Sequence, residues 1–97
     1  KRLPQIPNVP TMAEAGMPDF EVSSWNGILA PAKTPPEIVA KLNREIVRIL
    51  QLPDVREKFA AQGADPVGNS PEEFRAYIRA EIEKWGKVIR ESGAKID

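Results

Sequence analysis

The chain has 97 residues, and its 14 Lys and Arg side chains balance its 14 Asp and Glu side chains, so its formal net charge is zero. A neutral chain lacks the broad basic surface that typically binds nucleic acid or anionic lipid. The sequence contains no His and no Cys, which excludes disulfides, His- or Cys-ligated metal sites and histidine-activated nucleophiles. Proline is abundant: 10 of 97 residues, against a usual frequency of ~5%.

The length indicates one small domain with a modest core. No stretch approaches the ~18 consecutive apolar residues of a membrane span. The residues after Lys1 and Arg2 do not form the apolar segment of a secretory signal. Because the first residue is not Met, we expect the sequence to be part of a longer protein.

The N-terminal segment carries prolines at positions 4, 7 and 10, which favour an extended, poorly paired backbone. Thr11 and Glu14 then have the spacing of a capping box, which predicts a helix of one or two turns. Gly16 is suited to end this helix, and Pro18 prevents it from resuming.

Residues 20–31 are the one good candidate for a β-strand. They include the continuous apolar run Gly27–Ala30, which is typical of a strand covered on both faces. A strand needs partners in a sheet, and the chain offers only the weak segments Leu3–Ile6 and Pro66–Gly68. The alternative is that the partner strands lie outside this sequence.

Three longer helices are predicted from apolar residues at helical spacing, with proline or a cap at the start of each. The first spans 35–50 behind a capping box from Thr34 to Glu37, and the second runs from Pro53 to about Gln62. The third follows the box from Ser70 to Glu73, spans 71–92 and ends at Gly93. Its length of ~33 Å is large for a chain of this size, so we expect it to overhang or to lie across a larger body.

Ser24, Trp25 and Asn26 are the candidate ligand-binding residues. Small-ligand sites often combine an aromatic ring with a few hydroxyl and amide groups, and this segment supplies all three beside the flexible Gly27. The alternative is that Trp25 lies in the core while the serines cap or face water. Residue chemistry alone favours that alternative.

Two positions of the last predicted helix also invite a functional interpretation. Glu81 lies one turn before Trp85 and would be a general acid or metal ligand, but no second group has suitable spacing, so a structural role is favoured. Gly86 within the helix either permits close approach of another backbone or is a tolerated defect. A DNA-reading helix-turn-helix at 35–62 is disfavoured by its ordinary solvated side chains and the zero net charge.

The order of these features is similar to one protein family. The residues that carry the resemblance extend over nearly the whole chain: Leu3-Pro4, Pro7, Val9-Pro10-Thr11, Glu14-Ala15-Gly16, Phe20, Trp25, Gly27, Ala30-Pro31, Thr34-Pro35, Leu42-Asn43, Glu45, Leu50, Pro53, Val55, Gly63, Pro66, Gly68, Ser70-Pro71-Glu72, Phe74, Glu81, Trp85-Gly86, Val88-Ile89 and Gly93. This series resembles the C-terminal third of the Bug-type receptors, the extracytoplasmic solute-binding proteins of tripartite tricarboxylate transporters. Asn8 and Lys33 depart from residues that are common in the family, and both lie in predicted turns.

The resemblance implies an α/β fold class, in which this chain is a helix-rich fragment of a two-lobed type II periplasmic binding protein. That fragment would have one main strand and three to four helices. Residues 1–19 would form a crossover segment with a short helix, and residues 20–97 the C-terminal part of the first α/β lobe. The strand around Ser24, Trp25 and Asn26 would approach the ligand cleft.

The functional implication is a periplasmic receptor that captures a small carboxylate and passes it to membrane transporter subunits. The resemblance implies no enzymatic activity, no cofactor and no nucleic-acid partner. One alternative is a stand-alone helical module that self-associates through an exposed strand edge or its long helix. Another is an enzyme built on Glu81 and Trp85.

Overall fold

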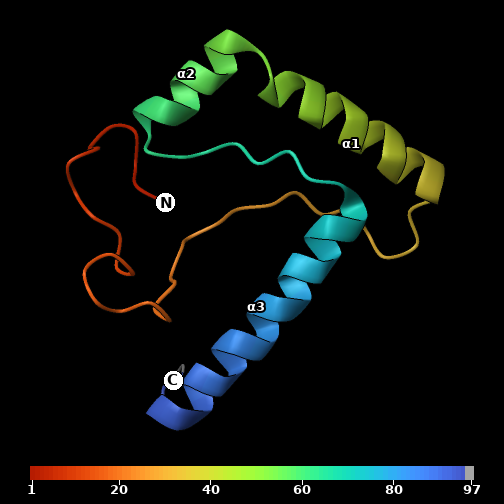
Figure 1. The fold of residues 1–97 in the computed structure, drawn as a ribbon. Helices are drawn as coiled ribbons and strands as arrows, with labels where there is room; N and C mark the ends of the chain where they lie inside the picture. Colours follow the sequence, from red (N-terminus) through yellow and green to blue (C-terminus); the bar gives the residue numbers. More distant parts are fainter. Residues whose placement is uncertain (96–97) are drawn as a thin grey trace. The chain divides into compact units, whose positions relative to one another are not determined.

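The computed structural model describes residues 1–95, and three helices form its regular structure. They are α1 (Pro36–Leu50), α2 (Pro53–Ala61) and α3 (Pro71–Ser92), shown in Figure 1. The chain divides into two compact units, of which the first is Lys1–Pro31 and the second begins at Ala32. All three helices therefore belong to the second unit.

Helix α1 begins one residue later than the sequence predicts, and the expected capping box from Thr34 to Glu37 is not formed. Pro35 is the N-cap, with an extended backbone (φ −54°, ψ 140°) and no side-chain cap. The cause is the Pro35-Pro36 pair, because a residue that precedes proline is driven out of the helical region. Pro36 thus becomes the first helical residue, and Thr34 lies one position too early to cap.

Helix α3 has the predicted bounds, Pro71–Ser92, and the predicted capping box. The amide of Glu73 donates to Oγ of Ser70 at 3.1 Å, and the amide of Ser70 donates to Oε1 of Glu73 at the same distance. This second hydrogen bond lowers the pKa of the Glu73 carboxyl below its usual value. At the other end Gly93 adopts the left-handed conformation (φ 71°) that closes the helix.

A short junction connects α2 to α3 and runs back beside α1 (Figure 1). Nδ2 of Asn43 in α1 donates to the carbonyl of Asn69 at 2.9 Å, in a partly buried hydrogen bond. Gly68 faces Val47 and Leu50 of the same helix, and its φ of +64° suits glycine. The junction therefore fixes the point where α3 starts against α1.

The strand expected at residues 20–31 is not formed: the structure assigns no strand within residues 1–95. Both expected partner segments are unsuited to a ladder. Leu3–Ile6 is closed into a turn, with the amide of Ile6 bonded to the carbonyl of Leu3 at 3.1 Å. In the other segment Pro66 has no amide donor and Gly68 has a positive φ. Within residues 1–95, neither expected segment therefore forms a strand beside residues 20–31.

The short helix of one or two turns expected at residues 11–16 is a single turn. Thr11 and Glu14 do form their capping box, and the amide of Ala15 bonds to the carbonyl of Thr11 at 3.0 Å. Gly16 then takes a φ of +107°, a conformation that suits glycine and ends the turn. The capping interaction was predicted correctly, and the single turn is the shorter of the two predicted lengths.

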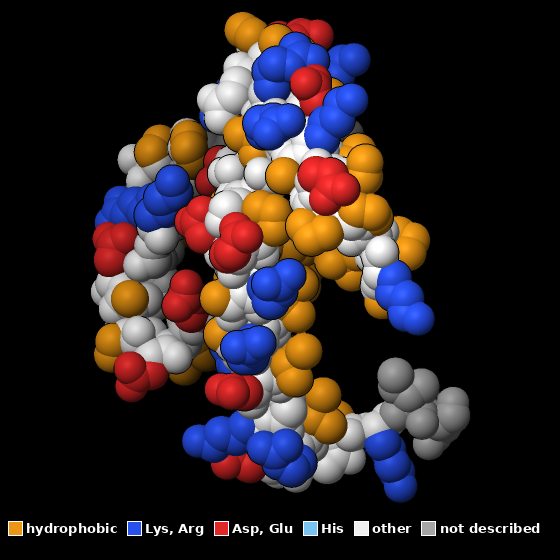
Figure 2. Space-filling view, turned by 90° about the vertical axis from the view of Figure 1, so that its right-hand side faces the viewer, with side chains coloured by type: hydrophobic (Ala, Val, Ile, Leu, Met, Phe, Trp, Pro, Cys, Tyr) orange, Lys and Arg blue, Asp and Glu red, His pale blue; other side chains and the backbone are white. Residues whose placement is uncertain are grey.

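No side chain of the described residues is fully buried. Half-buried residues of α1 and the first turns of α3 make the thin contact between these helices, and hydrophobic side chains lie open on the visible surface (Figure 2). Ile82 of α3 is 67% exposed and Leu29 of the first unit is 75% exposed. Because apolar burial is the main driving force of folding, the described residues have little of the core that usually stabilises a domain.

The Ser70 cap gives a first prediction. Ser70→Ala should lower the stability of α3 by about 1 kcal/mol, because the Glu73 amide loses its acceptor. Thermal and urea unfolding followed by circular dichroism at 222 nm would measure the loss. Ser23→Ala, an exposed serine outside the helices, is the matched control and should leave the helical signal unchanged. Equal effects of the two substitutions would contradict this role of Ser70.

Candidate functional site

The three sequence-predicted ligand residues lie together in the extended part of the first unit. Ser24, Trp25 and Asn26 are all exposed, and the Trp25 side chain retains 41% of its accessible surface. The described chain therefore does not bury Trp25.

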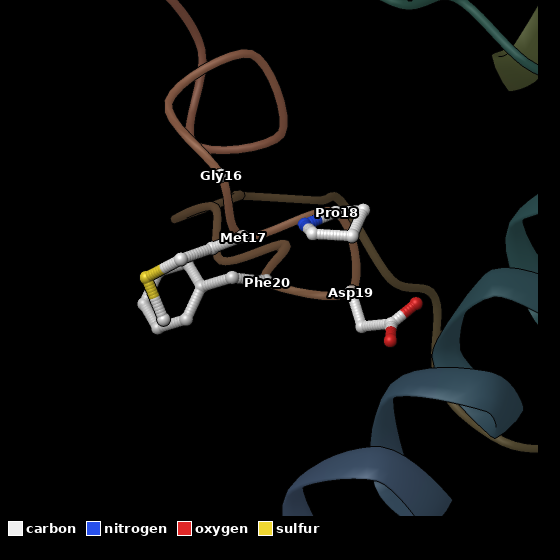
Figure 3. A pocket seen from close by; sticks show the side chains of 5 residues that line it. All are labelled: Gly16, Met17, Pro18, Asp19 and Phe20. Atoms are coloured by element: carbon white, nitrogen blue, oxygen red, sulfur yellow. The ribbon is translucent and has the colours of Figure 1, made fainter.

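An open depression lies nearby in the same unit, lined by Gly16, Met17, Pro18, Asp19 and Phe20 (Figure 3). The thioether of Met17 and the ring of Phe20 point to one side, while the carboxylate of Asp19 points to the other. The lining is thus mostly apolar and its charged group is an anion. A small carboxylate would be repelled by Asp19 there, so this depression does not suit an anionic ligand.

The best-formed polar cluster of the first unit is built from Arg2, Thr11 and Glu14. Nε of Arg2 donates to both carboxylate oxygens of Glu14 at 3.0 Å, and Nη2 pairs with the same group. Nη1 of Arg2 donates to the carbonyl of Pro7, also at 3.0 Å. Thr11 adds a hydroxyl contact to Glu14 at 3.2 Å. The cluster ties the start of the chain to the Thr11 turn.

These contacts change the proton affinities of the pair. The guanidinium of Arg2 lowers the pKa of the Glu14 carboxyl, with further lowering from the Thr11 amide and hydroxyl. The same hydrogen bonds raise the pKa of Arg2 above its usual value. Both groups are solvent-exposed, so the pair contributes little to stability but keeps Glu14 ionised. Arg2 is therefore already engaged by an internal carboxylate.

Sequence reasoning missed the Arg2–Glu14 pair. The two residues are twelve positions apart, and no helical or hairpin spacing connects them. The one sequence signal for this pair is that a positively charged residue, Arg2, and a carboxylate fixed by a capping box, Glu14, occur in the same short segment. Arg2, whose guanidinium is a strong donor to carboxylates, is engaged by Glu14 within the chain itself.

Glu81 is the one acidic residue of α3 with a partly shielded carboxylate. Its Oε2 atom is buried and has no hydrogen-bond partner among the described residues. Within the described part of the chain, no group of three or more acidic residues is placed to hold a metal ion. Among the described residues, Glu81 is therefore not a member of such a group.

Comparison with known proteins identifies the family. The sequence model described as "Tripartite tricarboxylate transporter family receptor" matches residues 1–94, which is nearly the whole chain. The chain therefore belongs to this receptor family, as the sequence resemblance predicted.

Individual relatives agree. The chain is 48% identical over 95 residues to the protein BugT of Bordetella pertussis, covering 98% of this chain and 29% of BugT. It is 44% identical over 91 residues to a UPF0065 protein encoded in the tcbD–tcbE intergenic region of Pseudomonas sp. strain P51, covering 93% of this chain and 27% of that protein. The chain thus spans less than a third of the length of these relatives. Among the described residues, no helix is both long and apolar enough to cross a membrane.

The Arg2–Glu14 pair predicts a specific pH dependence. Because the folded pKa of Glu14 is lowered, its contribution to stability is present above the unfolded pKa and disappears as pH falls through the folded value. Arg2→Gln should raise the pKa of the Glu14 carboxyl, measured by NMR titration of its side-chain carbon. Arg44→Gln, in α1, is the matched control and should leave that pKa unchanged. An unchanged Glu14 pKa in Arg2→Gln would contradict the pairing.

Proposed function

We propose that this chain is the C-terminal part of an extracytoplasmic solute-binding receptor that captures a small carboxylate for a tripartite tricarboxylate-type transporter. The supporting observation is the family match over residues 1–94, in a chain that spans 29% of the length of BugT. The receptor would act in the periplasm and pass its ligand to membrane subunits. Family membership does not favour a stand-alone self-association module.

In this proposal Ser24, Trp25 and Asn26 form part of one wall of the ligand cleft. The Ser24 hydroxyl, the Trp25 indole N–H and the Asn26 amide can each donate to a carboxylate oxygen. The Trp25 ring adds an apolar surface for the carbon skeleton of the ligand. These groups are exposed in the chain, so the opposing wall would come from the rest of the receptor. Binding then requires both walls, and the role of the chain is recognition rather than catalysis.

The first test uses the chain alone. Calorimetry with citrate, succinate, glutamate and benzoate should give no measurable heat of binding, because the three proposed donors lie on an exposed extended segment without an opposing wall. Micromolar affinity for any of these acids would contradict the need for a second wall.

The second test places the chain in a full-length relative, as a graft in which it replaces the matching segment of BugT (hereafter the BugT graft). The graft should bind a member of a panel of mono-, di- and tricarboxylates, detected by calorimetry. Trp25→Ala should weaken that binding by about tenfold or more, since it removes both apolar contact and a donor. Phe59→Ala, an exposed aromatic residue of α2, is the matched control and should leave affinity unchanged.

Three results would be decisive against parts of the proposal. A folded graft that binds none of the acids would contradict carboxylate capture. A graft that binds equally well with Ala at position 25 would remove Trp25 from the cleft. If Phe59→Ala weakens binding as much as Trp25→Ala does, the effect of Trp25 would be a general loss of packing.

A further inference from the structure

Asn26 and Gly27 form the one Asn-Gly pair of the sequence. An asparagine side chain can react with the amide nitrogen of the residue that follows it, because attack of that nitrogen on Cγ closes a succinimide ring. Glycine favours the attack, since it has no Cβ to hinder the approach and leaves the backbone free to turn. The pair therefore has the composition of a site that loses its side-chain ammonia spontaneously.

The surroundings of this pair leave the reaction open. The attacking amide must not be held in a hydrogen bond, because its nitrogen has to lose a proton and turn toward Cγ. The described residues supply no hydrogen-bond acceptor to the Gly27 amide. Asn26 and Gly27 are both exposed, and they lie in a segment without helix or strand (Figure 1).

The other three asparagines are each followed by an amide that is already bonded. They are Asn8, Asn43 and Asn69. The Val9 amide donates to a backbone carbonyl at 3.1 Å, and the Ser70 amide donates to Oε1 of Glu73, also at 3.1 Å. The Arg44 amide lies within α1, where backbone amides bond to the carbonyl four residues earlier. The fold therefore restrains the reaction at these three positions and not at Asn26.

We propose that Asn26-Gly27 is a site of spontaneous deamidation, which converts Asn26 to aspartate or isoaspartate. Hydroxide removes the amide proton of Gly27, and the nitrogen forms a bond to Cγ of Asn26. The bond between Cγ and Nδ2 then breaks. Ammonia leaves after it takes a proton from water, which regenerates the hydroxide, and the succinimide ring remains.

Water then opens the ring at either of its carbonyls. Cleavage of the new bond between Cγ and nitrogen gives aspartate, with the original main chain. Cleavage at the backbone carbonyl gives isoaspartate, in which the main chain runs through Cβ and Cγ. The net reaction consumes water and releases ammonia, and nothing is oxidised or reduced.

The modification has a consequence for ligand capture, and this consequence rests on the proposed function. There the Asn26 amide donates a hydrogen bond to a carboxylate ligand. Deamidation replaces that donor with a carboxylate, which is ionised at neutral pH and can only accept. An anionic ligand then meets a like charge, so a deamidated receptor should bind it more weakly.

The test follows all four asparagines in the folded chain. The chain is incubated in mildly alkaline buffer and digested, and its peptides are analysed by mass spectrometry that distinguishes aspartate from isoaspartate. Asn26 should react at least about tenfold faster than Asn69, because the amide after Asn69 must first leave its carboxylate partner. Isoaspartate should be present at position 26, since direct hydrolysis of the side chain gives aspartate alone.

Urea and a substitution identify the source of the difference. Urea unfolds the Ser70 cap, so it should accelerate the reaction at Asn69 by about tenfold and change the rate at Asn26 by less than about twofold. In the folded chain Gly27→Ala should slow the reaction at Asn26 by about tenfold, because the added Cβ hinders the attack. Ser23→Ala, in the same exposed segment, is the matched control and should leave the rate unchanged.

Four results would overturn the proposal. They are equal rates at Asn26 and Asn69 in the folded chain, reaction of Asn26 in urea only, aspartate without isoaspartate, and an unchanged rate in Gly27→Ala.

The BugT graft tests the consequence separately. Asn26→Asp should weaken carboxylate binding by about tenfold or more, because it exchanges a donor for an anion. Asn8→Asp, an exposed asparagine of the proline-rich start, is the matched control and should leave affinity unchanged. Equal affinity with Asp at position 26 would contradict the link to ligand capture. A graft that binds no carboxylate at all would contradict the proposed function, while the rates measured on the chain would still decide whether Asn26 deamidates.

Discussion

The hydrogen bond from the Asn43 side chain to the carbonyl of Asn69 is the interaction on which the arrangement of the helices depends. It is partly buried and 2.9 Å long, and it joins α1 to the residue that precedes the Ser70 cap of α3. Gly68 sits one residue earlier with its left-handed backbone, where a methyl group would fit against Val47 but the φ would be strained. A few atoms at this junction thus decide where the long α3 begins, and the rest of α3 receives little support from α1.

The features predicted correctly from the sequence are those set by residues that lie close together along the chain. Proline, glycine and capping side chains act within one turn, and both ends of α3 were read correctly from Ser70 and Gly93. The predicted start of α1 was one residue too early, because two effects compete at Pro35. Proline is favoured at the first helical position, but a residue that precedes another proline is driven out of the helical region, and this second effect prevails.

Interactions between distant residues were not predictable in the same way. A strand at residues 20–31 has the right composition, yet it needs hydrogen-bond partners that local composition cannot supply. The Arg2–Glu14 pair depends on how residues 3–13 turn, and no spacing rule reports it. The same limit applies to the proposed ligand residues Ser24, Trp25 and Asn26. The sequence shows which groups they offer to a ligand, but it does not show which residues would face them across a cleft.

The exposed apolar side chains of the described residues and the buried oxygen of Glu81 place different demands on their surroundings. An exposed apolar stripe can be covered by almost any apolar surface, since hydrophobic contact has no direction. The Glu81 Oε2 atom is different, because the chain itself shields it from solvent while none of the described residues donates a hydrogen bond to it, and an unpaired buried oxygen costs free energy.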